Sequence, residues 1–91
     1  MNAAIRHDAA RRRFELVVDG HACELDYAFE NGTMTITHTG VPAAVGGRGI
    51  AGELVATAFA TARANGWKVR AACSYAQAWA ARHPEHADLL A

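Results

Sequence analysis

The chain has 91 residues, of which 52% are hydrophobic and 20% charged, and its 9 basic and 9 acidic residues balance. This length allows one domain, expected to span residues 1–91, and the balanced charge argues against a nucleic-acid-binding surface. No apolar run approaches the roughly 20 residues of a membrane span, and the N-terminus lacks the apolar core of a secretory signal. Cys23 and Cys73 show no C-x-x-C spacing. They indicate free thiols in a reducing compartment, so we expect a cytoplasmic protein.

Three strands joined by tight turns are predicted in the first half of the chain. They are expected at residues 13–18, 21–29 and 33–38. The pair Asp19-Gly20 between the first two is a strong signal for a two-residue hairpin turn. In the third strand, alternation places Met34, Ile36 and His38 on one face. Adjacent strands with short turns predict an antiparallel meander.

The second half predicts a helix, a strand and a second helix. These are expected at residues 49–64, 67–72 and 75–82, followed by a C-terminal turn or short helix at 85–90. Asn65 and Gly66 tolerate the left-handed conformation that ends a helix. Ser74 is expected to be the N-cap of the second helix, and Leu89 and Leu90 are expected to pack on the core. The fold class is α+β, in the order β-β-β-α-β-α.

A glycine-rich loop leads directly into the first helix. It contains Gly46, Gly47, Arg48 and Gly49. Glycine reaches positive φ and lets a ligand approach the main chain, while a helix N-terminus attracts anions, so the loop predicts a site for a phosphorylated cofactor. With Gly52 the spacing also fits the bare G-x-G-x-x-G pattern, but a dinucleotide fold needs a parallel β-α-β context that this chain lacks. The alternative is an ordinary turn before a helix.

Two side chains are candidates for chemistry. Cys73 lies where the last strand meets the second helix, and a helix N-terminus favours the reactive thiolate; the alternative is an inert, buried cysteine. His38 ends the third strand and could act as a general base; the alternative is a local hydrogen bond. Tyr75 and Trp79, four residues apart, fit helix packing. The pair of histidines in His83-Pro84-Glu85-His86 is too few for a zinc site, so no metal is predicted.

Several segments form a recognisable series from residue 13 to residue 89. They are Asp19-Gly20, Leu25-Asp26-Tyr27, His38-Thr39, Val41-Pro42, Gly47-Arg48-Gly49-Ile50-Ala51, Leu54-Val55, Cys73-Ser74-Tyr75 and Arg82-His83-Pro84-Glu85. Each segment alone is a weak signal, whereas their order and spacing are specific. Together they resemble the short, single-domain YjdJ-type branch of the GCN5-related N-acetyltransferases (GNAT superfamily).

The resemblance implies a small, truncated GNAT-like fold that binds acetyl-CoA or coenzyme A. Main-chain N–H groups of the glycine loop would hold the pyrophosphate, and the end of the third strand would lie beside the pantetheine arm. The implied cofactor-binding residues are Thr39, Val41, Gly46, Gly47, Arg48, Gly49, Ile50 and Ala51. Cys73 would lie near the thioester, where this branch carries its candidate catalytic cysteine, and His38 is the second catalytic candidate.

Three positions depart from the pattern that the resemblance sets. Gly46 replaces the usual Gln or Arg, Gly40 replaces a Glu that follows His-Thr, and Ala71 replaces a proline. The predicted function is acetyl transfer from acetyl-CoA to an unidentified amine, with Cys73 as nucleophile or as proton donor. The alternatives are a CoA-binding module with little turnover and an interaction domain without a ligand. A monomer or homodimer is expected, with no nucleic-acid or membrane partner.

Overall fold

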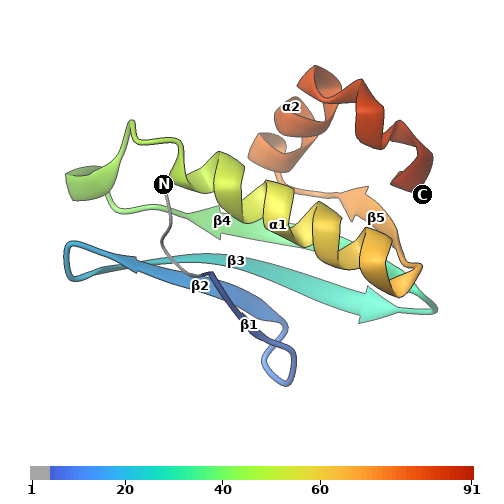
Figure 1. Ribbon diagram of the computed structural model, residues 1–91, viewed down its shortest axis with the longest axis horizontal. Coiled ribbons are helices and arrows are strands. Elements are labelled where there is room, and N and C mark those ends of the chain that lie inside the picture. Colours follow the sequence, from blue (N-terminus) through green and yellow to red (C-terminus); the bar gives the residue numbers. More distant parts are fainter. Residues whose placement is uncertain (1–4) are drawn as a thin grey trace.

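The computed structural model describes residues 5–91. The first four residues of the N-terminus, for which no secretory signal is predicted, lie outside the described residues. A five-stranded sheet carries both helices on one face (Figure 1). The elements are β1 (Arg6–Asp8), β2 (Arg13–Val18), β3 (His21–Glu30), β4 (Thr33–Gly40), a 3-10 turn η1 (Ala43–Val45), α1 (Ile50–Asn65), β5 (Lys68–Ala71), α2 (Ser74–Arg82) and a 3-10 segment η2 (Pro84–Leu89). No helix within the described residues is both long and apolar enough to cross a membrane.

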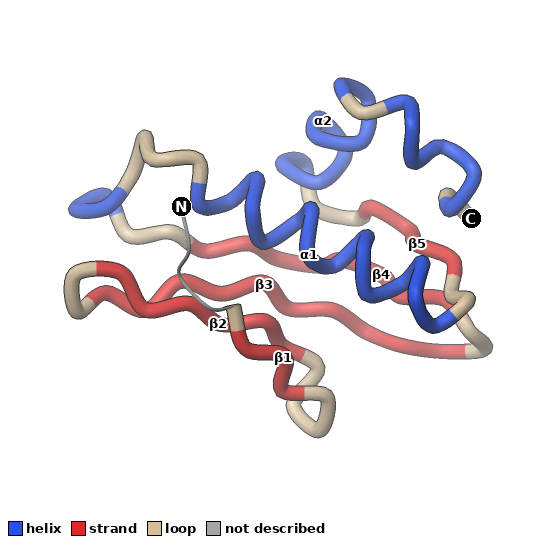
Figure 2. Tube along the Cα trace, in the orientation of Figure 1, coloured by secondary structure: helices blue, strands red, loops and turns tan. Residues whose placement is uncertain are grey.

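The sheet follows the chain in the order β1-β2-β3-β4-β5. All neighbours are antiparallel except β4 and β5, which are parallel because α1 carries the chain back across the sheet between them (Figure 2). The predicted α+β class and the β-β-β-α-β-α order are therefore confirmed, with β1 as an additional first strand.

β1 forms because of its partners and not because of its own sequence pattern. His7 lies opposite Phe14 of β2, and the two rings stack with centroids 4.2 Å apart. His7 Nε2 also lies 2.7 Å from the Tyr27 hydroxyl, on β3. These contacts hold a polar three-residue strand at the edge of the sheet.

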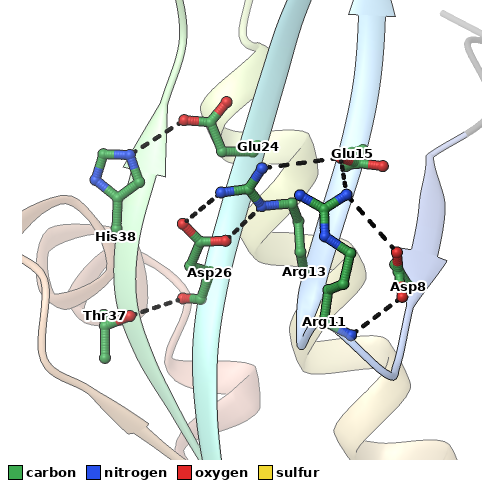
Figure 3. Close-up of polar contacts among 8 residues, drawn as sticks. All are labelled: Asp8, Arg11, Arg13, Glu15, Glu24, Asp26, Thr37 and His38. Atoms are coloured by element: carbon green, nitrogen blue, oxygen red, sulfur yellow. Dashed lines mark hydrogen bonds and ion pairs between the residues drawn. The ribbon is translucent and has the colours of Figure 1, made fainter.

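The core lies between the sheet and the two helices. Its largest fully buried side chains include Phe14, Leu25, Met34, Ile36, Leu54 and Phe59. Phe59 of α1 contacts Trp79 of α2, with ring centroids 5.1 Å apart, so the helices also pack on each other. Trp79 thus takes the packing role predicted for it. The opposite face of the sheet, which we call the outer face, has no helix of residues 5–91 over it and carries charged side chains (Figure 3).

A β-bulge in β4 reverses which side chains face the core. Tyr27 lies opposite Ile36 on the core face, but the register shifts at the next position. Asp26 lies opposite His38, and Thr37 is the additional residue between the two pairs. The prediction that His38 shares a face with Ile36 is therefore wrong, because one extra residue moves every later side chain to the other face.

The predictions for the end of α1 and for the C-terminal segment are confirmed in part. Gly66 ends α1 with φ 73°, in the left-handed conformation expected there. Leu89 is buried as predicted, but Leu90 remains 39% exposed and forms a parallel bridge with Val69 at the edge of β5. The prediction that Leu90 packs on the core is wrong, since its backbone is committed to extending the sheet edge.

Candidate functional site

β4 and β5 separate after Ile36. Their parallel register ends with the pair of Ile36 and Ala71. The amides of Ala72 and Cys73 then both donate to the Ile36 carbonyl, at 2.9 and 3.1 Å, and the chain turns into α2. β4 continues to Gly40 without β5 beside it. The last part of β4 thus has a free edge on this side within residues 5–91.

A pocket of about 280 Å³ lies at the N-terminus of α1, beyond the end of β4. It is lined by Val41, by the loop glycines Gly46, Gly47 and Gly49, by Ile50 and Ala51 of α1, and by Tyr75 of α2. The structure therefore brings together six of the eight predicted cofactor-binding residues. Thr39 is half-buried in β4 and Arg48 is exposed, and neither lines this pocket.

The backbone amides at the start of α1 are free of partners in the described chain. No hydrogen bond within residues 5–91 uses the amides of residues 47–52; the first one engaged is that of Glu53, which donates to the Gly49 carbonyl at 3.1 Å. Gly47 and Gly49 both have φ 78°, a left-handed conformation that glycine adopts without strain. A run of unpaired amides at a helix N-terminus is a ready anion site.

Gly46 contributes differently from its neighbours. Its φ of −68° is ordinary, and its amide donates to the Ala43 carbonyl at 3.1 Å. Gly46 lines the pocket, but its N–H group is already engaged and cannot donate to a ligand. The donors of the loop therefore begin at Gly47.

Arg48 points away from the pocket toward the β2–β3 hairpin. Its Nη1 lies 2.8 Å from Oδ2 of Asp19. Asp19 has φ 50°, as the first residue of the predicted Asp-Gly turn. Because both side chains are about half-exposed, this ion pair contributes little to stability, and its geometric effect is to tie the glycine loop to the hairpin.

Cys73, not Ser74, is the N-cap of α2. Its Sγ accepts a hydrogen bond from the Ala76 amide at 3.3 Å, whereas Ser74 is the first helical residue. The Ser74 prediction is wrong because the chain turns into the helix one residue earlier, where Cys73 has the extended backbone of a cap, with ψ 148°. The thiol of Cys73 is half-buried and unpaired. Cys23 is also free, and its burial in the core raises the pKa of its thiol.

Tyr75 is a site residue that the sequence analysis assigned only to helix packing. It lines the pocket from α2, and a Cβ added to Gly52 of α1 would lie 3.3 Å from its hydroxyl. Gly52 thus lets Tyr75 lie close against the first turns of α1. The signal in the sequence was the combination of a glycine inside the helix, Gly52, with Tyr75 directly after Cys73-Ser74.

His38 lies on the outer face, beside β3. Its Nε2 is 3.2 Å from Oε2 of Glu24, and its side chain is 54% exposed (Figure 3). No interaction among residues 5–91 joins it to Cys73, whose side chain caps a helix on the core face. The structure therefore does not bring the two predicted catalytic residues into contact.

Comparisons with known proteins agree with this architecture. Residues 13–89 match the family model of the GCN5-related N-acetyl-transferases. Among solved structures, the chain is similar to a protein from Staphylococcus aureus, determined by NMR in solution and described as GCN5-like with a proposed N-acetyltransferase activity. That similarity has a TM-score of 0.78 and 28% sequence identity, and it covers 99% of this chain and 89% of the other. No curated protein matches this sequence.

Proposed function

Because the chain belongs to the GCN5-related N-acetyltransferase family, we propose that it is an acetyl-CoA-dependent N-acetyltransferase of the short YjdJ-type branch. The observation that carries the proposal is the run of unpaired amides at residues 47–52 beside an open pocket. The two unpaired cysteines support a cytoplasmic location.

The pocket and the free edge of β4 suit different parts of coenzyme A. The amides of Gly47, Gly49, Ile50 and Ala51 would donate to the diphosphate, with the helix dipole adding a favourable charge. The pantetheine arm is an extended chain with two amides, and it would pair with the free edge of β4 near Thr39, as a peptide adds to a sheet edge. This placement directs the thioester toward the start of α2, where Cys73 lies.

The chemistry is the transfer of an acetyl group from sulfur to nitrogen. The amine nitrogen attacks the thioester carbonyl, the C–S bond breaks, and the CoA thiolate takes up a proton. Cys73 would either accept the acetyl group first, forming a thioester with its own sulfur, or donate a proton to the leaving thiolate. His38 would accept the proton that the amine loses.

Ligand binding is tested by comparing coenzyme A with pantetheine, which lacks the diphosphate. We expect calorimetry to give an at least tenfold lower Kd for coenzyme A, and millimolar coenzyme A to raise the melting temperature. Equal affinity for the two ligands, or no binding of either, would remove the role of the glycine loop.

Catalysis is tested by mass and turnover. Incubation with acetyl-CoA should add one acetyl group to the wild type and none to Cys73→Ser if the thiol is the nucleophile. An unmodified mass together with acetylation of added amines would exclude a stable acetyl-enzyme, and slower turnover in Cys73→Ser would then assign Cys73 to proton donation. The separation of His38 from Cys73 favours a second candidate function, a CoA-binding module without turnover, and binding without amine acetylation would establish it.

A further inference from the structure

Glu24 contacts His38, the base of the proposed function, but has no role in that function so far. Glu24 of β3 and Gly40 of β4 are directly opposite in the register, and His38 lies two residues before Gly40. The Glu24 carboxylate and the His38 ring therefore meet on the outer face, beside the part of β4 that has lost its pairing with β5 (Figure 3).

The contact between Glu24 and His38 depends on the absence of a side chain at Gly40. A Cβ built at position 40 would overlap Oε2 of Glu24 and would lie 3.0 Å from Nε2 of His38. Real side-chain atoms do not overlap in this way, so any larger residue at position 40 would displace the carboxylate. The carboxylate of Glu24 thus fills the space in which a side chain at position 40 would begin.

Neighbouring carboxylates are already committed to other partners. Asp26, the next outward residue of β3, forms a two-bonded ion pair with Arg13, at 2.6 Å to Nε and 3.1 Å to Nη2 (Figure 3). Glu15 lies within 3.9 Å of the same guanidinium. Within the described chain, Glu24 is the carboxylate that contacts His38.

The contact also fixes which ring nitrogen of His38 is free. A carboxylate only accepts hydrogen bonds, so in the neutral ring the Nε2 that faces Glu24 carries the hydrogen and Nδ1 holds the lone pair. Figure 3 shows Nδ1 directed away from Glu24. A histidine held in one tautomer by a carboxylate is the arrangement in which imidazole acts as an oriented base.

We infer that Glu24 is a positioning residue that holds His38 as the base for an alkylammonium acceptor, in a place made available by Gly40. This inference rests on the proposed acetyl transfer. His38 Nδ1 takes one proton from the ammonium, the resulting neutral amine forms the new C–N bond as the thioester C–S bond breaks, and the second amine proton ends on the CoA thiol. Glu24 stabilises the imidazolium that forms.

The test uses two kinds of acceptor with acetyl-CoA. Spermidine and tyramine are ammonium ions at neutral pH and need a base, whereas hydroxylamine is largely neutral and does not. We expect Glu24→Ala and Glu24→Gln to lower kcat for the alkylamines about tenfold or more, to change hydroxylamine turnover less than about twofold, and to leave the Kd of coenzyme A unchanged. Glu24→Gln preserves side-chain size and an acceptor for Nε2, so its loss of turnover reports the missing charge, whereas a general folding defect would be visible as a lower melting temperature.

A carboxylate supplied from the opposite strand provides the decisive control. Gly40→Glu alone should lower alkylamine turnover, since its Cβ displaces Glu24, whereas Glu24→Ala combined with Gly40→Glu should recover it to within about threefold of the wild type. Long-range proton–nitrogen NMR spectra should show the Nε2–H tautomer of His38 in the wild type and a mixture in Glu24→Ala.

The outcomes separate the two proposals. Unchanged alkylamine turnover and an unchanged tautomer in Glu24→Ala would overturn the positioning role and leave acetyl transfer standing. Turnover of hydroxylamine but of no alkylamine in the wild type would also overturn it. Absence of turnover with every acceptor would overturn the proposed transferase activity, and the role of Glu24 with it.

Discussion

The two helices begin at the same pocket but in opposite ways. α1 starts after Gly49, whose left-handed backbone offers no side-chain cap, and its first amides have no partner in the described chain. α2 starts after Cys73, whose Sγ accepts the Ala76 amide. Every helix N-terminus has unpaired amides that need partners. In α2 the Cys73 cap satisfies one of these amides, whereas none of the amides of residues 47–52 has a partner in the described chain, so the uncapped start of α1 is the better candidate for an anion site.

The largest effect is expected from placing a negative charge at the uncapped end. Ala51 lines the pocket in the first turn of α1. In Ala51→Asp the carboxylate would repel a bound diphosphate by about 2 kcal/mol, roughly a 30-fold increase in Kd for coenzyme A. The same carboxylate is favourable for the helix dipole, so the melting temperature should stay equal or rise. Calorimetry and thermal unfolding measure the two effects separately.

Ala56→Asp is the matched control, because Ala56 is exposed on the same helix and does not line the pocket. It should leave the Kd nearly unchanged. Equal losses of affinity in both variants would indicate a long-range charge effect and would contradict a diphosphate at the start of α1.

The sequence predicts that the glycine loop is important, but it does not predict what each glycine does. Gly47, Gly49 and the cap at Gly66 all adopt positive φ, and glycine is the residue that does so without strain. Gly46 has an ordinary φ, and Gly52 is needed for its closeness to Tyr75. A glycine in a sequence indicates either a positive φ or a close neighbour that leaves no room for a side chain. Only the surrounding fold shows which of the two reasons applies.

The second-largest effect is expected from alanine substitutions in the loop, which separate the need for positive φ from the need for space. In Gly49→Ala the new Cβ meets nothing within 4 Å, so the cost is the strain of φ 78°, about 1–2 kcal/mol. For a chain of this size that lowers the melting temperature by several degrees. Gly49→Asn should recover part of the loss, because asparagine tolerates this conformation. Gly46→Ala, at φ −68°, carries no such strain, so any loss there reports the close contact of its Cβ with the Ala43 carbonyl, at 3.3 Å. We expect this loss to be smaller than that in Gly49→Ala, and the reverse order would contradict the assigned backbone roles.

The features that the sequence did not reveal depend on pairing between distant residues. The bulge that moves His38 to the outer face exists only in the register between Asp26 and His38, and strict alternation in Thr33–Gly40 gives no sign of it. β1 has no apolar pattern and forms by stacking on Phe14. The Asp-Gly turn, by contrast, is encoded in two adjacent residues, and Asp19 has the positive φ that this turn requires.

A smaller effect tests the capped helix. Cys73→Ala removes the Sγ that accepts the Ala76 amide and should lower the free energy of unfolding by about 0.5–1 kcal/mol. Cys73→Ser keeps an acceptor at the cap and should match or exceed the wild type in urea unfolding, while it abolishes any acetylation of the thiol. Identical stability of the alanine and serine variants would show that the cap contributes nothing measurable, and would leave chemistry as the reason for a thiol at this position.

The smallest effect is expected at the C-terminal end of α1, which an ion pair joins to η2. Arg63 in its last turn forms two hydrogen bonds, at 3.0 and 2.9 Å, with the carboxylate of Asp88 in η2. The hydrogen bonds from Arg63 lower the pKa of Asp88 below its ordinary value of 3.8. Since the folded state lowers this pKa, the carboxylate stabilises the fold above about pH 4, and this contribution is lost as the pH falls further. Both side chains are largely exposed, so the contribution is modest and should weaken in high salt.

Asp88→Asn keeps the shape of the side chain and leaves the Asp88 carbonyl, which accepts from Lys68 Nζ at 2.8 Å, in place. Urea unfolding at pH 6 should show the variant slightly less stable than the wild type, and the difference should shrink as the pH falls below about 4 and the wild-type carboxyl takes up a proton. A difference that does not change with pH in this range would mean that Asp88 acts through packing and not through charge. Coenzyme A affinity should be the same in both proteins at pH 6, because the charge-held end of α1 lies at the opposite end of the helix from the uncapped end that is proposed to bind the ligand.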